Sequence, residues 1–149
     1  MQRDTWPDPP ESRQQAGFEE IEHTADWALR IYSRDLRGLL INAARGMNSL
    51  LIDRTEAVPL DREETFELDG LDPESLLVSW LSELAYWAEQ EQVIFREFDL
   101  PEVSPTWLRA VVRGGRAPDL KKHIKAVTYH NLAIIESEGG LTATVVFDV

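Results

Sequence analysis

Hydrophobic residues recur at helical spacing in two stretches of the chain. Residues 35–52 carry one such stripe, made of leucine, alanine and methionine side chains (Leu36, Leu39, Leu40, Ala43, Met47, Leu50, Leu51). Residues 72–92 carry a second stripe, which contains two tryptophans (Leu76, Leu77, Trp80, Leu81, Leu84, Trp87, Ala88). This spacing predicts two amphipathic helices that each bury one face. Asp35 and Asp72 are the predicted N-caps, and Pro73 suits the first helical position.

Outside these helices, hydrophobic and polar residues alternate with period two. The alternation predicts β-strands at 18–23, 27–33, 57–70, 93–100, 107–114, 123–130, 132–138 and 141–149. Residues 138–140, Glu-Gly-Gly, predict a tight hairpin turn between the last two strands. The expected fold is therefore α+β, with a largely antiparallel sheet of about seven strands and two helices packed on one face, as a two-layer sandwich.

The alternation of the last strand also assigns its faces. Leu141, Ala143, Val145 and Phe147 are expected to face the helices, and Asp148 the opposite side. Asp148 then lies at a strand end, beside the α-carboxylate of Val149. Two anionic groups this close repel each other unless a cation or a basic side chain neutralises them.

Composition narrows the class of protein. The 149 residues are 43% hydrophobic, which suits one globular domain at 17–149, preceded by a proline-containing disordered tail at 1–16. The chain has no cysteine, which excludes disulfides, thiol nucleophiles and cysteine-based metal sites. No apolar run reaches the ~20 residues of a membrane span, and the N-terminus lacks the apolar region of a signal peptide. A cytoplasmic protein is expected.

The charge is strongly acidic and unevenly distributed. The net charge of −12 disfavours general nucleic-acid binding, because such a chain repels phosphate backbones. Residues 109–125, in contrast, carry a local charge of +5, from six basic residues and one acid (Arg109, Arg113, Arg116, Lys121, Lys122, Lys125 and Asp119). A basic patch on an acidic body suits a protein partner or one that carries RNA. A solvated face without a partner is the alternative.

Few residues offer site chemistry. Asp26, in an early turn, could join Asp148 and Val149 in an all-oxygen site for a hard cation, which His23 could join if the metal were softer. Each carboxylate could equally be a turn cap or a solvated strand end. Lys125 lies within a predicted strand, where it is either an exposed residue or a partner of these carboxylates or of a bound phosphate.

Catalytic motifs are absent from the sequence. It has no glycine-rich phosphate loop, no paired-histidine zinc motif and no nucleophile elbow. A metal-dependent hydrolase built on Asp26, Asp148 and His23 stays open as an alternative, although it would lack a nucleophile activator.

Several motifs together resemble the archease family. These are EHTADWALRI (22–31), DLRGLLINAARGMNSLLID (35–53), ESLLVSWLSELAYWAEQE (74–91), IKAVTYHNLAI (124–134) and GGLTATVVFDV (139–149). The resemblance runs in order from about Phe18 to Val149 and leaves the tail outside. It implies a non-enzymatic protein that activates the RNA-splicing ligase RtcB in tRNA splicing and RNA repair. Activation would promote guanylylation of the ligase and allow multiple turnovers.

The resemblance also implies particular site residues. Asp26, Asp148 and Val149 match the family's metal site, whose ion is expected to be calcium, and Lys125 matches the lysine needed for activation. His23 is a candidate for the surroundings of the metal. A second role described in the family is chaperone-like modulation of a tRNA cytosine methyltransferase. The alternative function is therefore a chaperone-like module that docks on RNA-modifying enzymes. The protein itself is not expected to bind nucleic acid in a sequence-specific way.

Overall fold

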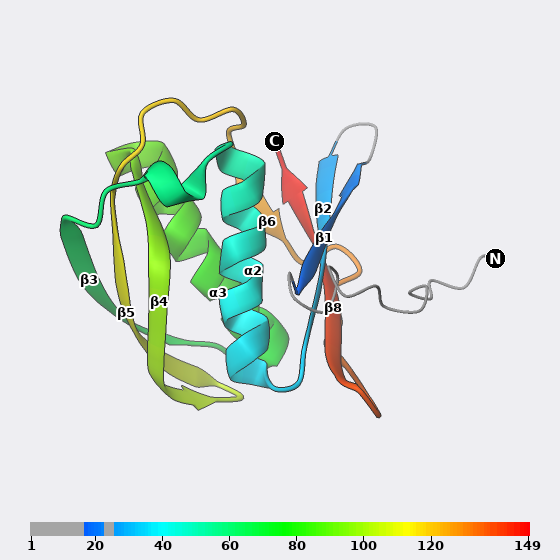
Figure 1. Cartoon of the computed structure of the whole chain (residues 1–149). Helices are drawn as coiled ribbons and strands as arrows, with labels where there is room; N and C mark the ends of the chain where they lie inside the picture. Colours follow the sequence, from blue (N-terminus) through cyan, green and yellow to red (C-terminus); the bar gives the residue numbers. More distant parts are fainter. Residues whose placement is uncertain (1–16, 23–25) are drawn as a thin grey trace.

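Two antiparallel sheets enclose a layer of two helices. The computed structural model describes residues 17–22 and 26–149, so the predicted tail at 1–16 lies outside the described residues. Helices α2 and α3 lie between the sheets, with β3, β5 and β4 on one side and β1, β2, β8 and β6 on the other (Figure 1). The hydrophobic core fills both interfaces between helices and sheets.

The larger sheet is built around the C-terminal strand. Its order is β1-β2-β8-β6, and β7 also pairs with β8. The strands are β1 (Phe18–Glu22), β2 (Asp26–Ser33), β6 (Ala126–Thr128), β7 (Ile135–Ser137) and β8 (Gly140–Asp148). Ser137 and Gly140 pair directly, which confirms the predicted hairpin turn, and Gly140 has a φ of 128° that favours glycine.

The smaller sheet has three strands in the order β3-β5-β4. They are β3 (Arg62–Asp69), β4 (Val93–Ser104) and β5 (Trp107–Arg116). Leu108, Ala110 and Val112 of β5 are fully buried against the helix layer. The intervening residues of β5 face away from it, as period-two alternation requires.

Helix α2 (Leu36–Leu51) forms as its stripe predicts. The Asp35 carboxylate accepts a 2.8 Å hydrogen bond from the Gly38 backbone N–H, which confirms the predicted N-cap. Gly46 lets the helix approach the larger sheet, since a Cβ there would lie 2.6 Å from Leu29 Cδ2. The helix therefore packs tightly on β2, the strand that begins at Asp26.

Helix α3 (Pro73–Tyr86) begins as predicted and ends in an unexpected way. Asp72 and Ser75 form a reciprocal capping box, with Pro73 in the first turn. The last predicted turns are a π-helix, η2 (Trp87–Glu91), which stops at Gln92 in a left-handed conformation with φ 57°. Trp80 is fully buried and its Nε1 donates a 2.8 Å hydrogen bond to the Leu40 carbonyl, so it ties the two helices together.

The α+β class with two helices is confirmed, and the structure adds how its strands are divided. Eight described strands form two sheets, so the helices pack on both of their faces rather than on one face of a single sheet. Alternation identifies the apolar side of a strand but not the strand with which it pairs.

Three predicted strands are shorter than expected. The strand predicted over 57–70 begins only at Arg62, after a short 3-10 helix η1 (Thr55–Ala57). The strand predicted over 123–130 shortens to the three residues of β6, and the strand predicted over 132–138 shortens to the three residues of β7. No helix in the described ranges is long and apolar enough to cross a membrane.

Candidate functional site

The two aspartates singled out by the sequence lie directly opposite each other. Asp26 opens β2 and Asp148 closes β8, and the antiparallel register pairs these two residues. The start of β2 and the end of β8 accordingly lie side by side at one end of the larger sheet (Figure 1). Residues 122 positions apart in the chain are thus brought together only by strand pairing. We call Asp26, Asp148 and Val149 the acidic tip.

Buried neighbours fix which way the Asp148 side chain points. Ala143, Val145 and Phe147 of β8 face the helices and are almost completely buried, as predicted. Asp148 therefore faces the opposite side and is exposed, while Asp26 is half-buried on the same side. Directly opposed side chains of like charge destabilise a strand pair. Within the described residues neither carboxylate has an ion-pair partner.

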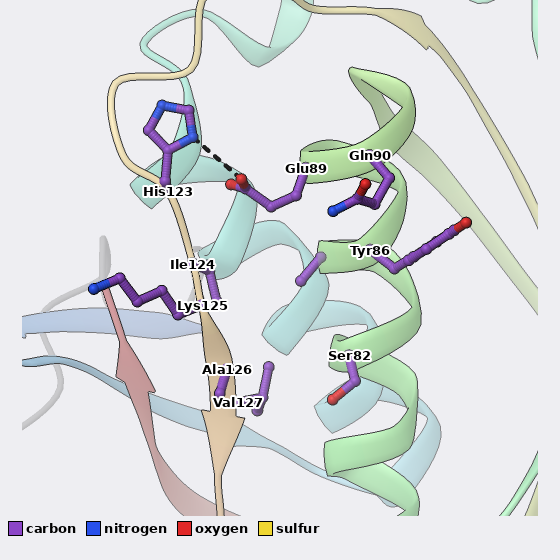
Figure 2. A pocket seen from close by; sticks show the side chains of 10 residues that line it. Ser82, Tyr86, Glu89, Gln90, His123, Ile124, Lys125, Ala126 and Val127 are labelled. Atoms are coloured by element: carbon purple, nitrogen blue, oxygen red, sulfur yellow. Dashed lines mark hydrogen bonds and ion pairs between the residues drawn. The ribbon is translucent and has the colours of Figure 1, made fainter.

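Lys125 lies beside the acidic tip. Its backbone N–H donates a 2.7 Å hydrogen bond to the Asp148 carbonyl, just ahead of β6. The Lys125 side chain is exposed and in Figure 2 extends away from helix α3, toward the end of β8. The three positions Asp26, Asp148 and Lys125 therefore converge. They come from two adjacent strands and from the segment that leads into a third.

Comparison with known proteins identifies the family. The model of the Archease protein family (MTH1598/TM1083) matches residues 18–149. The protein archease of Methanosarcina mazei is 36% identical over 140 residues, which cover 89% of this chain and 95% of that protein. The protein archease of Methanopyrus kandleri is 34% identical over 139 residues, which cover 89% and 99%. This chain belongs to the archease family.

Solved structures have the same fold. The solution structure of Methanobacterium thermoautotrophicum protein 1598 has a TM-score of 0.73 at 29% identity and covers 90% of this chain and 99% of that one. The crystal structure of a Thermotoga maritima archease, described there as a possible chaperone, has a TM-score of 0.58 at 24% identity. It covers 88% of this chain and 96% of that one. The archease fold is thereby established for this chain.

The other residues predicted for the site are His23 and Val149. His23 lies outside the described residues. Val149 is half-buried and packs against the hydrophobic core, so the end of β8 is held firmly in place. Among the described residues, no three side chains of His, Cys, Asp or Glu cluster as a ready-made metal site. The acidic tip consists of two carboxylate side chains and the main chain at Val149, so the metal assignment stays a prediction.

A contact that the sequence did not reveal borders the acidic tip. The Lys122 ammonium lies 3.8 Å from the centroid of the Trp27 ring. Trp27 follows Asp26 in β2 and pairs with Phe147 of β8, so this cation–π contact holds the segment before β6 against the acidic tip. Lys122 was visible only as part of a basic run, because nothing local links it to a residue 95 positions earlier.

The predicted basic patch is corrected by the structure. Arg109 pairs with Glu67 and Glu102 at 3.8 and 3.7 Å, because β5 lies between the strands that carry these acids. Arg113 likewise lies 3.8 Å from Glu63 and 3.1 Å from Glu97. Lys121 pairs at 3.1 Å with Asp53, which follows helix α2. Three of the six basic residues therefore pair with acids, and a fourth, Lys122, lies over the Trp27 ring.

Proposed function

We propose that this archease is a non-enzymatic activator of the RNA-splicing ligase RtcB, and that it acts in the cytoplasm through its acidic tip. Membership of the archease family supports the general role. The observation that carries the proposal is the register that sets Asp26 opposite Asp148. Two opposed carboxylates without an ion-pair partner among the described residues form a costly arrangement that a ligand would relieve.

The acidic tip suits a hard divalent cation. Asp26, Asp148 and Val149 offer oxygen atoms alone, and calcium prefers oxygen ligands from carboxylates and carbonyls. We therefore assign calcium as the ion, held by these three residues, with His23 as a candidate for its surroundings. A bound cation would supply the positive charge that offsets the repulsion between the two carboxylates. Asp148 needs no large movement to take part, since its side chain is already exposed.

Lys125 would act beside the acidic tip as a cationic group. Its backbone is tied to Asp148, and its ammonium has no ion-pair partner among the described residues, so it is available to an anionic group of the ligase. An activator can shift the ligase only by binding its competent state more tightly than its resting state. Charged groups held on a rigid sheet end provide contacts that can discriminate between two such states.

A ligation assay tests this proposal. Limiting RtcB would be incubated with RNA ends, Mn²⁺ and GTP, with and without this protein. Wild type is expected to raise product beyond one turnover per ligase. Asp26→Ala and Lys125→Ala are expected to remove most of that increase. Asp99→Ala is the matched control, because Asp99 is an exposed carboxylate at the other sheet, opposite Val111.

The outcomes separate the parts of the proposal. Activation by wild type and Asp99→Ala but not by Asp26→Ala would support both the activator role and the acidic tip. Equal activation by all variants would rule out the acidic tip as the effector. Absence of activation by wild type with the cognate ligase would reject the activator role itself.

A chaperone-like role is the second candidate. It is favoured by the description of the Thermotoga maritima relative as a possible chaperone. In this role the protein would bind an RNA-modifying enzyme, such as a tRNA cytosine methyltransferase, and keep it active. Slower aggregation of the methyltransferase on heating, equally with wild type and Asp26→Ala, would favour this role over ligase activation.

A further inference from the structure

Strand β6 is the last strand of the larger sheet on one side, among the residues that the structure describes. Its partner β8 covers one edge, and no described strand pairs with β6 on its far side. The free edge of a strand presents backbone N–H and C=O groups that can pair with another chain. The segment that leads into β6, residues 123–125, runs on in the same direction (Figure 2).

A groove lies between this segment and one face of helix α3. The cavity has a volume of about 430 Å³ and is lined by residues 123–127 and by side chains of α3 and η2. Ser82, Ala85 and Glu89 of that lining are three and four positions apart, so they follow one helix face. Figure 2 shows Ser82, Glu89 and Gln90 pointing from the helix toward residues 123–127.

The chemistry of the groove changes along its length. Its middle is apolar, formed by Ala85, which is 8% exposed, and Val127, which is 9% exposed. Its upper part in Figure 2 is polar, where Glu89 Oε1 lies 3.2 Å from His123 Nδ1. The other carboxylate oxygen, Oε2, is buried without a hydrogen-bond partner among the described residues. Glu89 is the one charged residue that the helix contributes to the lining of the groove. The Lys125 side chain, on the opposite wall, extends away from the helix.

We propose that this groove binds an extended peptide segment of a partner protein, which adds a strand to the free edge of β6. Backbone groups of β6 would provide hydrogen bonds that do not depend on sequence, and the α3 side would select side chains. An apolar side chain fits over Ala85 and Val127, and a basic one fits at Glu89. A net charge of −12 also favours a basic peptide.

This surface is separate from the acidic tip, although the two share a segment. Residues 123–127 line the groove, while Lys125 of the same segment hydrogen-bonds to Asp148. The inference goes beyond the proposed activator role, because the acidic tip itself needs no peptide in the groove. A peptide docked on this segment would also hold Lys125 in a fixed position.

A titration followed by NMR tests the groove directly. The full-length ¹⁵N-labelled protein would be titrated with two acetylated and amidated pentapeptides, Arg-Val-Arg-Val-Arg and Glu-Val-Glu-Val-Glu. Saturable amide shifts are expected at residues 124–128 with the basic peptide. The acidic peptide is expected to bind at least about tenfold more weakly, because its carboxylates would meet Glu89.

Two substitutions and a matched control sharpen the test. Glu89→Gln should weaken the basic peptide about tenfold, since it removes a charge-assisted hydrogen bond. Glu91→Gln removes the same charge from an exposed position of the same helix outside the groove and should leave binding unchanged. Ser82→Trp fills the groove from an exposed helix position and should abolish binding while circular dichroism stays native.

Three results would overturn the inference. They are shifts that do not saturate at 124–128, shifts centred on another surface, or equal losses in Glu89→Gln and Glu91→Gln. None of these results depends on the ligase. Failure of the activator proposal would therefore leave this titration interpretable, and failure of the titration would leave the ligation assay intact.

Discussion

Both sheets of this archease bring carboxylates close together across strands, but they treat the charge differently. On the outer face of the three-stranded sheet, Arg109 and Arg113 stand between acids of the flanking strands and pair with both sides. At the acidic tip of the larger sheet, Asp26 faces Asp148. Among the described residues, the Lys122 ammonium lies over the ring of the adjacent Trp27 and forms no ion pair with either carboxylate.

This difference bears on the proposal that the acidic tip binds a ligand. Charges that are already paired on an exposed sheet contribute little and need nothing further. Opposed charges without a basic partner raise the free energy of the folded state. A protein can retain such an arrangement when binding of a ligand offsets this unfavourable energy. The contrast therefore supports the proposal that the acidic tip, rather than the acids on the other sheet, is the functional end of the molecule.

The strongest test of this contrast is the response of stability to calcium. At a calcium concentration one hundred times the dissociation constant, we expect the free energy of unfolding of wild type to rise by about 2.7 kcal/mol. Thermal unfolding in EDTA and in calcium measures this. The double variant Asp26→Asn/Asp148→Asn should show no rise. Glu97→Gln/Glu102→Gln, which removes two acids from the other sheet, should keep it, and equal responses of the two double variants would contradict the contrast.

The Lys122–Trp27 contact should have a smaller but measurable effect. Lys122→Met is expected to lower the free energy of unfolding by about 0.5–1 kcal/mol, because it removes the cation from the ring. Urea unfolding with an unchanged m value measures the loss. Lys121→Met is the control, since it breaks only the exposed pair with Asp53 and should cost less. A larger loss for Lys121→Met would show that the ring contact is not the one that matters.

Neutralising one tip carboxylate without metal should stabilise the protein. Asp148→Asn in EDTA removes the opposed charge, so we expect the free energy of unfolding to rise by about 0.5 kcal/mol. Asp99→Asn should change nothing, because Asp99 is opposite Val111. Chemical unfolding at low salt is the appropriate measurement, and a loss of stability in Asp148→Asn would mean that the tip carboxylates are already compensated.

The smallest effect is expected on the paired face. Arg113→Gln should lower the free energy of unfolding by about 0.3 kcal/mol, because exposed ion pairs contribute little. The loss should shrink further in 1 M salt, where the Debye length falls to about 3 Å. A loss above about 1 kcal/mol that persists in salt would mean that this face is more than a solvated, charge-paired surface.

The sequence predicts this structure best where the stabilising interactions are local. Asp35 and Asp72 cap the helices as predicted, because a cap depends on residues within one turn. The alternation of β8 correctly separated Val145 and Phe147 from Asp148. Alternation failed for residues 123–130. It predicted a strand over all eight residues, but only Ala126–Thr128 pair with β8.

The chain by itself determined which segments are helices, which face of β8 is buried, and which residues could carry chemistry. Tertiary structure alone decided that Asp26 lies opposite Asp148, that the arginines of β5 meet acids on both sides, and that β6 lies beside α3 without a described partner strand on that side. The reason is physical. Helical and strand periodicity depend on neighbouring residues, whereas strand pairing joins distant segments, and its register depends on how the whole apolar surface is buried.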